Sequence, residues 1–462
     1  MTPLEVVDAA IRAVEAIDPH LHALVLKDYE RARGDARALQ RDLPLSGVPF
    51  LIKDMVVYTD NWPTTHCSRF FADARPRPDS EIVRRWRAAG AVFLGKTNSP
   101  EFAEDFATEP AFRGPTFNPW NSLFTVGGSS GGAAAAVASG MVPVAHGSDL
   151  GGSIRVPAAC CGVFGLKPSR GLNPVGPYAA ETSGGLNCEH VISRSVRDSA
   201  AFLDATAGPE PGAPYRVQRA VPSYLKALDQ PLSPLRIVSL DRRMDGSEID
   251  PEIAERVSDA AAMLEALGHT VVPGRFPAAL APALAGESWS ALWLIDIAQA
   301  INEHAAEIGR PPEQGEIEQL SSYVLARVER MSALEYMAAR RAAHTAALAM
   351  AREFAQFDFI LLPTTSALPI PLGSTAPNAP DFDYARWVEI AYGFAAFTEI
   401  FNVTGQPAAS LPLFQAANGM PIGMQLVGRQ NEDHRLLRLA ADLEIVNGWG
   451  NRHPPLWAGR AA

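Results

Sequence analysis

Short apolar runs alternate with longer stretches of helical periodicity along this chain. The runs are four to six residues long and cover 48–52, 91–94, 142–145, 237–240 and 357–362. Runs of this length, bounded by proline or glycine, predict buried strands, and the periodic stretches between them predict helices. Their alternation is typical of an α/β protein in which helices cover a sheet.

Capping residues mark where several of these helices begin and end. Thr2-Pro3-Leu4-Glu5 is a capping box with proline at the first helical position. A helix over 80–89 ends at Gly90, and a helix over 251–267 begins after Asp250. Because apolar residues recur at helical spacing directly after the capping box, we expect a folded helix there rather than a signal peptide.

The region from about 275 to 355 is almost wholly helical in pattern, and we interpret it as an excursion from one domain that spans 1–462. The chain is 47% apolar and 20% charged, which is ordinary for a globular protein with a large interior. Recurrent motifs from 47 to 429 favour a single core over several independent domains.

Charge and hydropathy exclude several classes of protein. The net charge is -11 and no basic run occurs, which disfavours nucleic acid and anionic membranes as partners. No apolar stretch approaches the length that spans a bilayer. The cysteines show neither a disulfide framework nor zinc-ligand spacing, so we expect a cytoplasmic protein with no metal and no cofactor. They are Cys67, Cys160, Cys161 and Cys188.

Serine recurs twice inside glycine, and this is the strongest chemical signal in the chain. One cluster is the GGSSGG stretch at 127–132, and the other is the DLGGSIR stretch at 149–155. Glycines remove side chains around a hydroxyl, so its oxygen can reach a substrate carbonyl while neighbouring backbone N–H groups bind an oxyanion. With the Lys53-Asp54 pair upstream, these clusters suggest a hydrolase with a nucleophilic serine.

These motifs resemble the signature of the amidase signature family. The GVPFLIKD segment at 47–54, both serine clusters and the GVFGLKP segment at 162–168 all match its pattern. Further landmarks at 95–98, 118–121, 194–198 and 404–425 extend the resemblance over most of the chain. The resemblance implies a mixed central β-sheet of many strands, covered by helices on both faces.

The resemblance also implies a Ser-Ser-Lys triad. Ser153 would be the nucleophile, Lys53 the base, and Ser129, on a cis peptide, the proton relay between them. A lysine can act as a base only when neutral, and the apolar residues before Lys53 favour the burial that lowers its pKa. Ser130, Asp149 and Arg155 would support the site. The expected oxyanion donors are the backbone N–H groups of Leu150, Gly151, Gly152 and Ser153.

Other interpretations of the same segments remain open. GGSSGG also suits a flexible linker or an anion site at a helix N-terminus. Residues 128–132 spell the G-x-S-x-G nucleophile elbow of α/β-hydrolases, which would make Ser130 the nucleophile with His269 or a later histidine as base. The stretch 90–97 satisfies the P-loop expression, but its variable residues read as a buried strand and no helix follows. An inactive binding protein is disfavoured because the whole triad is present.

The substrate class depends on weaker signals. Residues 184–196 depart from the commoner pattern and resemble the branch with cyclic nylon-oligomer hydrolases and urethanases, whereas 108–113 match no usual pattern. We therefore expect hydrolysis of uncharged, partly hydrophobic amides or carbamates by a monomer or homodimer. The alternative is the amidase subunit of a glutamine-dependent tRNA amidotransferase. Aromatic residues that could form a pocket wall are Trp289, Trp293, Trp387, Tyr392, Phe394 and Phe397.

Overall fold

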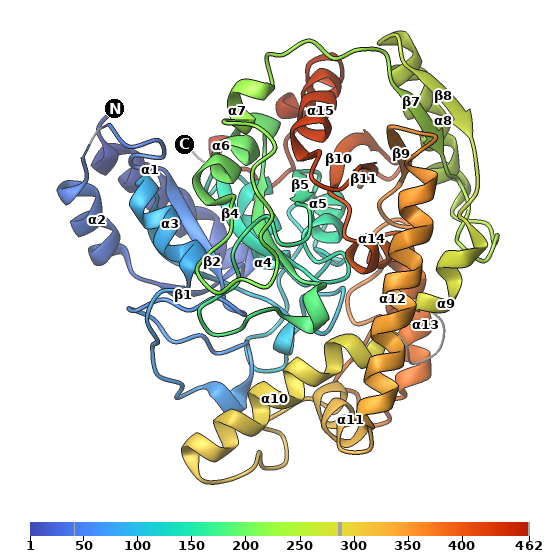
Figure 1. The fold of residues 1–462 in the computed structure, drawn as a ribbon. Helices are drawn as coiled ribbons and strands as arrows, with labels where there is room; N and C mark the ends of the chain where they lie inside the picture. The colour runs from blue at the N-terminus through green and yellow to red at the C-terminus, as the bar shows by residue number, and fades with distance from the viewer. Residues whose placement is uncertain (41, 285–288, 461–462) are drawn as a thin grey trace.

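One mixed sheet runs through the protein. The structure, a computed structural model, describes residues 1–40, 42–284 and 289–460, so residues 285–288 of the predicted helical region lie outside it. In this described part the sheet has 11 strands, in the spatial order β1-β3-β2-β4-β6-β5-β10-β11-β9-β7-β8 (Figure 1). The strands are β1 (Leu24–Lys27), β2 (Pro49–Lys53), β3 (Val92–Thr97), β4 (Val144–Asp149), β5 (Phe164–Lys167), β6 (Cys188–Ser193), β7 (Arg236–Ser239), β8 (Thr270–Pro273), β9 (Phe359–Pro363), β10 (Ala408–Gln415) and β11 (Pro421–Gly428).

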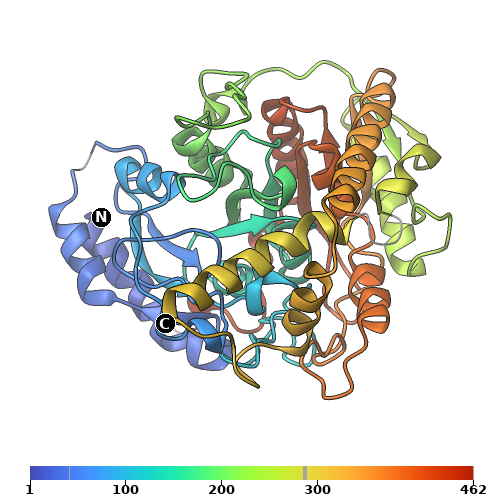
Figure 2. The same ribbon diagram turned by 60° about the horizontal axis from the view of Figure 1, so that its bottom comes forward.

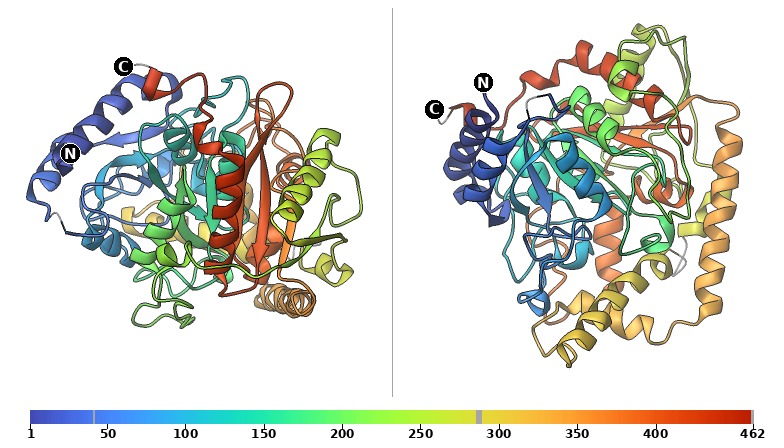
Figure 3. Two further views of the ribbon diagram at one scale, coloured as in Figure 1. Left: turned by 90° about the horizontal axis from the view of Figure 1, so that it is seen from above. Right: turned by 60° about the vertical axis from the view of Figure 1, so that its left-hand side comes forward.

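The helices lie on both faces of this sheet, as the sequence predicts (Figures 1 and 3). The α-helices are α1 (Pro3–Leu21), α2 (Tyr29–Ala38), α3 (Glu81–Ala89), α4 (Gly131–Ala138), α5 (Arg155–Cys161), α6 (Val196–Thr206), α7 (Tyr224–Ala227), α8 (Pro251–Ala266), α9 (Ala281–Leu284), α10 (Ser290–Ile308), α11 (Gln319–Val328), α12 (Ala333–Glu353), α13 (Tyr384–Phe394), α14 (Glu399–Thr404) and α15 (Asp433–Asn447). Short 3-10 turns are η1 (Arg69–Phe71), η2 (Glu101–Ala103), η3 (Ser183–Gly185), η4 (Ala278–Leu280), η5 (Trp449–Asn451) and η6 (Ala458–Arg460). None of the described helices combines the length and apolarity needed to cross a bilayer.

Strand β2 shows how the sequence assigns a side chain to each face. Phe50 packs against Trp86 of α3 and Phe202 of α6, with ring centroids 5.0 Å apart in both pairs. Leu51 belongs instead to the cluster formed with α1, α4 and α5. Successive side chains of a strand point to opposite faces, so an uninterrupted apolar run is the pattern expected of a strand covered on both sides.

The centre of the sheet brings two strand ends together. β2 runs parallel to both β3 and β4, with Phe50 opposite Val144. The carboxyl ends of parallel strands meet at one edge of a sheet, so Lys53 and Asp149 end their strands on the same edge. Helix α4 begins at Gly131, inside the first serine cluster, and α5 begins at Arg155, the last residue of the second.

All five predicted runs overlap an observed strand, but β4 and β9 each begin two residues after the start of their run. The run at 142–145 predicts a strand that starts earlier than β4 does, at Val144. Pro143 has no backbone N–H to give to a ladder, and Met141 N–H closes the end of α4 by donating to Ala136 O. The P-loop-like stretch contains β3, all of whose residues are buried, which agrees with the interpretation as a strand.

The predicted helical region lies outside the central sheet. Helix α10 packs against α11, α12 and η3, and in Figure 2 it crosses the front of the molecule. At another part of the surface, η6 near the C-terminus contacts α1 near the N-terminus (Figure 3). Helix α10 also lies near the serine clusters, because its Trp293 lines the same cavity as Ser129 and Ser153.

Candidate active site

Lys53 and Ser129 meet inside the protein. Both side chains are fully buried, and Lys53 Nζ donates to Ser129 Oγ at 2.6 Å and to Ser148 Oγ at 3.0 Å. Burial lowers the pKa of Lys53 to about 7, although Glu189 and Asp149 oppose this effect. An amine with this pKa is about half neutral at neutral pH, and this neutral form can accept a proton.

The carboxylate next in sequence does not neutralise Lys53. Asp54 accepts instead from Lys96 Nζ at 3.0 Å and from the Thr65 hydroxyl. Burial alone would raise the pKa of Asp54, but Lys96 and the hydrogen bonds from Thr65 lower it below its ordinary value. This buried pair leaves Lys53 without a carboxylate in direct contact among the described residues.

The loop that carries Ser129 is closely packed. The Gly128–Ser129 peptide bond is cis, as the resemblance implies. A Cβ atom on Gly128 would lie 2.5 Å from the carbonyl oxygen of Asp105, so only glycine fits there. Ser129 is therefore held against the backbone of a neighbouring loop.

Ser153 lies where the second serine cluster meets the cavity. Its side chain is 6% exposed and lines the same cavity as Ser129. Among the described residues, the Ser153 hydroxyl makes no hydrogen bond, which leaves its oxygen open toward the cavity. Both serines expected in a triad therefore face one space.

The oxyanion loop differs from expectation at Gly152. The Gly152 N–H donates to Asp149 Oδ1 at 2.9 Å, so it is not free to bind a substrate oxygen, and this part of the prediction is wrong. The N–H groups of Leu150, Gly151 and Ser153 donate to no acceptor in the described part of the chain. Three of the four expected donors remain available.

Asp149 and Arg155 fix the position of the loop at 150–153. Arg155 forms a two-armed ion pair with Asp149, with nitrogen–oxygen distances of 2.9 and 2.8 Å, and both side chains are fully buried. Arg155 also donates to Asn402 Oδ1 at 2.5 Å and to Gln425 Oε1 at 2.7 Å. Burial alone would raise the pKa of Asp149, but Arg155 lowers it to about 2. The ion pair thus fixes the loop to α14 and β11.

Ser130 lies away from the cavity. Its hydroxyl is fully buried and donates to the Ser148 carbonyl at 3.2 Å, while its N–H donates to the Ser153 carbonyl at 3.1 Å. His269, the histidine that the nucleophile-elbow alternative would need, accepts from Leu235 N–H beside β7. The Ser130 hydroxyl is thus directed to a backbone carbonyl instead of the cavity, which argues against Ser130 as the nucleophile.

Sequence reasoning missed a polar network beneath Lys53. His146 Nδ1 accepts from the Lys53 N–H at 3.3 Å, and its Nε2 lies 2.7 Å from Glu189. Asn187, which lines the cavity, donates to the other oxygen of Glu189 at 2.6 Å. Like Ser148, these residues come from strands β4 and β6 or the turn before them, and only the pairing of those strands reveals the network.

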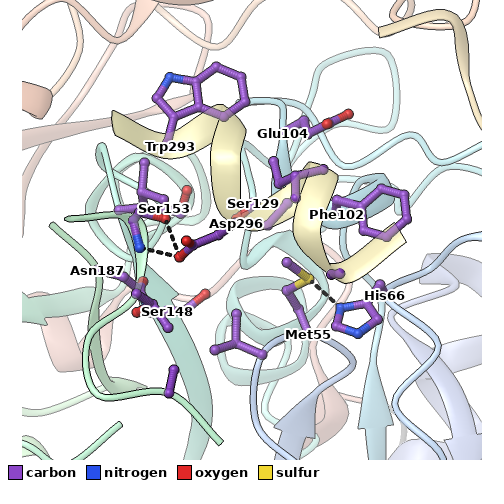
Figure 4. A pocket seen from close by; sticks show the side chains of 18 of the residues that line it. Met55, His66, Phe102, Glu104, Ser129, Ser148, Ser153, Asn187, Trp293 and Asp296 are labelled. Atoms are coloured by element: carbon purple, nitrogen blue, oxygen red, sulfur yellow. Dashed lines mark hydrogen bonds between the residues drawn. The ribbon is translucent and has the colours of Figure 1, made fainter. Parts of the chain in front are cut away.

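A cavity of about 400 Å³ opens above the serines (Figure 4). Among the predicted aromatic residues, Trp289, Trp293 and Tyr392 line it. The cavity wall does not include Trp387, Phe394 or Phe397, which belong to the core. Arg77 is the only arginine or lysine among the described residues that line this cavity. Its other lining residues include Met55, Phe102, Phe106, Ile297 and Asp296.

A cluster of carboxylates joins the cavity wall to the helical region. The Ser321 hydroxyl of α11 lies 2.6 Å from Glu101 Oε2 and 2.8 Å from Glu104 Oε2. Burial raises the pKa of both carboxyls, and it raises that of neighbouring Glu318 to about 8. One hydroxyl hydrogen cannot serve two carboxylates, so a protonated carboxyl satisfies this geometry.

Comparison with known proteins agrees with this site. The Amidase family model matches residues 5–437. The chain is 35% identical over 461 residues to 6-aminohexanoate-cyclic-dimer hydrolase of Paenarthrobacter ureafaciens, covering 98% of this chain and 93% of the relative. It is 32% identical to an acylamidase of Rhodococcus erythropolis, covering 98% and 94%.

A solved structure extends the similarity to three dimensions. The structure of 6-aminohexanoate cyclic dimer hydrolase complexed with substrate superposes with a TM-score of 0.94 at 35% identity, covering 99% of this chain and 96% of that chain. The fold and family that the motifs indicated are thereby confirmed. The chain belongs to the amidase family and is an amide-bond hydrolase.

Proposed function

We propose that this hydrolase cleaves uncharged, partly hydrophobic amides or carbamates through an acyl-enzyme on Ser153. The main supporting observation is that Ser153 and Ser129 line one aromatic-lined cavity and that Ser129 is hydrogen-bonded to Lys53. Anilides, oligoamides and aryl urethanes are the substrate types that combine a cleavable carbonyl with apolar groups for such a wall.

In the proposed mechanism, Ser153 Oγ attacks the substrate carbonyl. Its proton passes to Ser129, and Ser129 passes its own proton to neutral Lys53. The negative charge on the carbonyl oxygen is bound by the N–H groups of Leu150, Gly151 and Ser153, and such donors contribute about 2.7–4 kcal/mol each in comparable sites. The proton then returns along the same path to the leaving nitrogen, and water cleaves the acyl-enzyme by the same route.

The cavity wall supports the substrate class. Arg77 lies over the ring of Tyr58, 5.1 Å from its centroid, and 3.5 Å from Glu307. Its positive charge therefore already has partners, which argues against binding the free carboxylate of glutamine or asparagine. The two relatives named above are described as acting on a cyclic amide dimer and on acylamides, which agrees with this class.

The alternative role is the amidase subunit of a glutamine-dependent tRNA amidotransferase, which would act on glutamine and need partner subunits. We propose instead an enzyme that acts alone, as a monomer or homodimer in the cytoplasm, without a nucleic-acid or membrane partner. The net charge of -11 without a basic run supports this proposal.

A substrate panel tests the proposal. Purified enzyme is given an acyl anilide, an aryl carbamate, a cyclic amide dimer and glutamine, with the Ser153→Ala variant as control and with EDTA in a parallel series. We expect turnover of one or more of the first three, no turnover by the variant, and no effect of EDTA. Fastest turnover of glutamine would contradict the substrate class, and full activity of Ser153→Ala would contradict the mechanism.

A further inference from the structure

Asp296 brings a carboxylate to the same cavity as the serines. It lies on α10, within the helical region, and lines the cavity together with Ser129 and Ser153. Figure 4 shows Asp296 at the pocket with Ser129 and Ser153, and its hydrogen-bond partner is Ser183. It is therefore positioned to meet a bound substrate from the side opposite the central sheet.

Its hydrogen bonds leave one carboxylate oxygen open. The backbone N–H of Ser183 donates to Asp296 Oδ2, and the Ser183 hydroxyl lies 3.5 Å from the same oxygen. Among the described residues nothing donates to Oδ1, and no lysine, arginine or histidine forms an ion pair with this side chain. Burial raises the pKa of Asp296, which is the effect expected of a carboxylate without a cation.

Four other carboxylates of the described residues line the cavity. Glu104 and Glu303 each accept one side-chain hydrogen bond, from Ser321 at 2.8 Å and from Gln299 at 2.7 Å, whereas both oxygens of the other two have donors. Glu181 pairs with Arg340 at 2.5 Å and accepts from Tyr215 at 2.6 Å. Asp105 accepts from Thr375 Oγ1 at 2.5 Å and from the N–H of Phe106. Asp296 differs from both because an acceptor oxygen faces the cavity without a donor from the protein.

The residues around Asp296 define what could supply that donor. Trp293 and Ile297, one turn before it and directly after it on α10, line the cavity and are apolar. A ligand in this place therefore needs an apolar stem and a hydrogen-bond donor, and a carboxylate binds a charged donor most strongly. A substrate ending in a carboxylate would instead be repelled.

We propose that Asp296 is a specificity-determining residue that accepts a hydrogen bond from a second N–H group of the substrate. This group is an amide or ammonium nitrogen, separated from the scissile amide by an apolar chain. The inference rests on the proposed function and narrows its substrate class to amides that carry such a second nitrogen.

Four anilides with acyl chains of equal length test the proposal. The chains end in a methyl group, a secondary amide, an N-methylated tertiary amide or an ammonium group. The wild type is expected to prefer the secondary amide over the tertiary amide, and the ammonium over the methyl group. A hydrogen bond to a charged group corresponds to a preference of about 10- to 100-fold in kcat/KM.

The Asp296→Asn variant separates recognition from structure. Its side-chain oxygen can still accept from Ser183 N–H, so the turn stays in place while the charge is lost. We expect the ammonium preference to fall by about tenfold or more, with the methyl-ended anilide unchanged within about twofold. The control is Glu329→Gln, which removes an exposed carboxylate at the end of α11, outside the cavity wall, and should affect all four substrates alike.

Two outcomes would overturn the inference. An equal loss on all four anilides with Asp296→Asn would show that Asp296 only holds the Ser183 turn, and absence of any wild-type preference would show that it meets no donor. If no anilide is cleaved, the proposed function fails. Calorimetry then measures how simple amides with the same four chain ends bind to the Ser153→Ala variant. Tighter binding of the ligands that carry an N–H group, lost when Asp296→Asn is added, would uphold the role of Asp296. Equal binding of all four ligands would overturn it.

Discussion

Lys53 Nζ and Ser129 Oγ lie 2.6 Å apart with no water-exposed surface on either side chain. The ammonium form of Lys53 lacks solvent and a carboxylate in direct contact, so its pKa falls to about 7. The Ser129 hydroxyl, a proton donor, is therefore in direct contact with an amine that can be neutral in the pH range where enzymes operate.

The rate of hydrolysis is expected to depend on this titration. In the proposed mechanism neutral Lys53 is the active form, so kcat/KM on an anilide should rise as pH increases through about 7 and then level off. The measurement is a pH profile from about 5 to 9, the range that brackets this pKa. Lys53→Arg is the control, since its guanidinium stays charged and should give little activity at any pH. A wild-type profile that falls over this range would contradict the assignment.

Replacement of Ser153 should stop acyl-enzyme formation. We expect kcat of Ser153→Ala to drop by about 10⁴-fold or more, since the proposed nucleophile is removed. An electrophilic serine probe followed by peptide mass analysis should label Ser153. Ser130→Ala should keep this labelling, because the Ser130 hydroxyl is directed to the Ser148 carbonyl. If the probe labels Ser130 of the wild type instead, the assignment of Ser153 as the nucleophile is wrong.

Removal of Arg155 should destabilise the protein as well as inactivate it. Arg155→Met leaves the buried Asp149 without its partner, and breaking such a pair costs about 3–5 kcal/mol. Thermal unfolding measures the loss. The matched control is Arg242→Met, whose ion pair with Glu248 is exposed and is worth about 0–1 kcal/mol. Equal melting temperatures of Arg155→Met and the wild type would disprove a supporting role.

The carboxylate cluster around Ser321 should make stability depend on pH. The pKa values of these carboxyls are raised in the folded protein, to about 8 for Glu318. The folded protein therefore keeps protons that the unfolded chain releases above 4.5, the ordinary pKa of a glutamate. This contribution is complete below that value and is lost as pH rises toward about 8.

The Glu104→Gln variant should weaken that dependence, by about 1 kcal/mol for each pH unit over which one proton is retained. Unfolding of wild type and variant between pH 5 and 8 compares the slopes, a range inside the window set by the raised pKa values. Glu316→Gln is the control, because Arg310 lowers the pKa of Glu316 to about 2, outside the range. Parallel curves for Glu104→Gln and the wild type would exclude a shared proton.

The glycine-flanked serines and the strand before Lys53 could be predicted from sequence, because each depends on residues that are neighbours in the chain. Ser148 and the His146–Glu189 contact could not, since β4 and β6 are joined only by strand pairing. Gly152 was misassigned for a related reason. The spacing of a loop does not show which of its N–H groups turn inward to a carboxylate.

The aromatic residues illustrate a second limit. Trp293 and Trp387 both lie on amphipathic helices and both are buried, yet only Trp293 borders the cavity. Helical periodicity shows that a side chain faces inward, but core and cavity wall have the same polarity. Asp296 was equally hidden, because an acidic residue on a helix ordinarily faces solvent.

The carboxylate of Asp149 has a further consequence for the loop above it. It binds the N–H groups of Gly152 at 2.9 Å and Ile154 at 3.1 Å, and Arg155 holds it in turn. Water around a developing oxyanion must rotate its dipoles, whereas amides fixed in this way are already oriented before substrate arrives. In the proposed mechanism, the N–H of Gly152 therefore helps to keep the other three donors in place. Their dipoles are oriented when the protein folds rather than during each catalytic cycle.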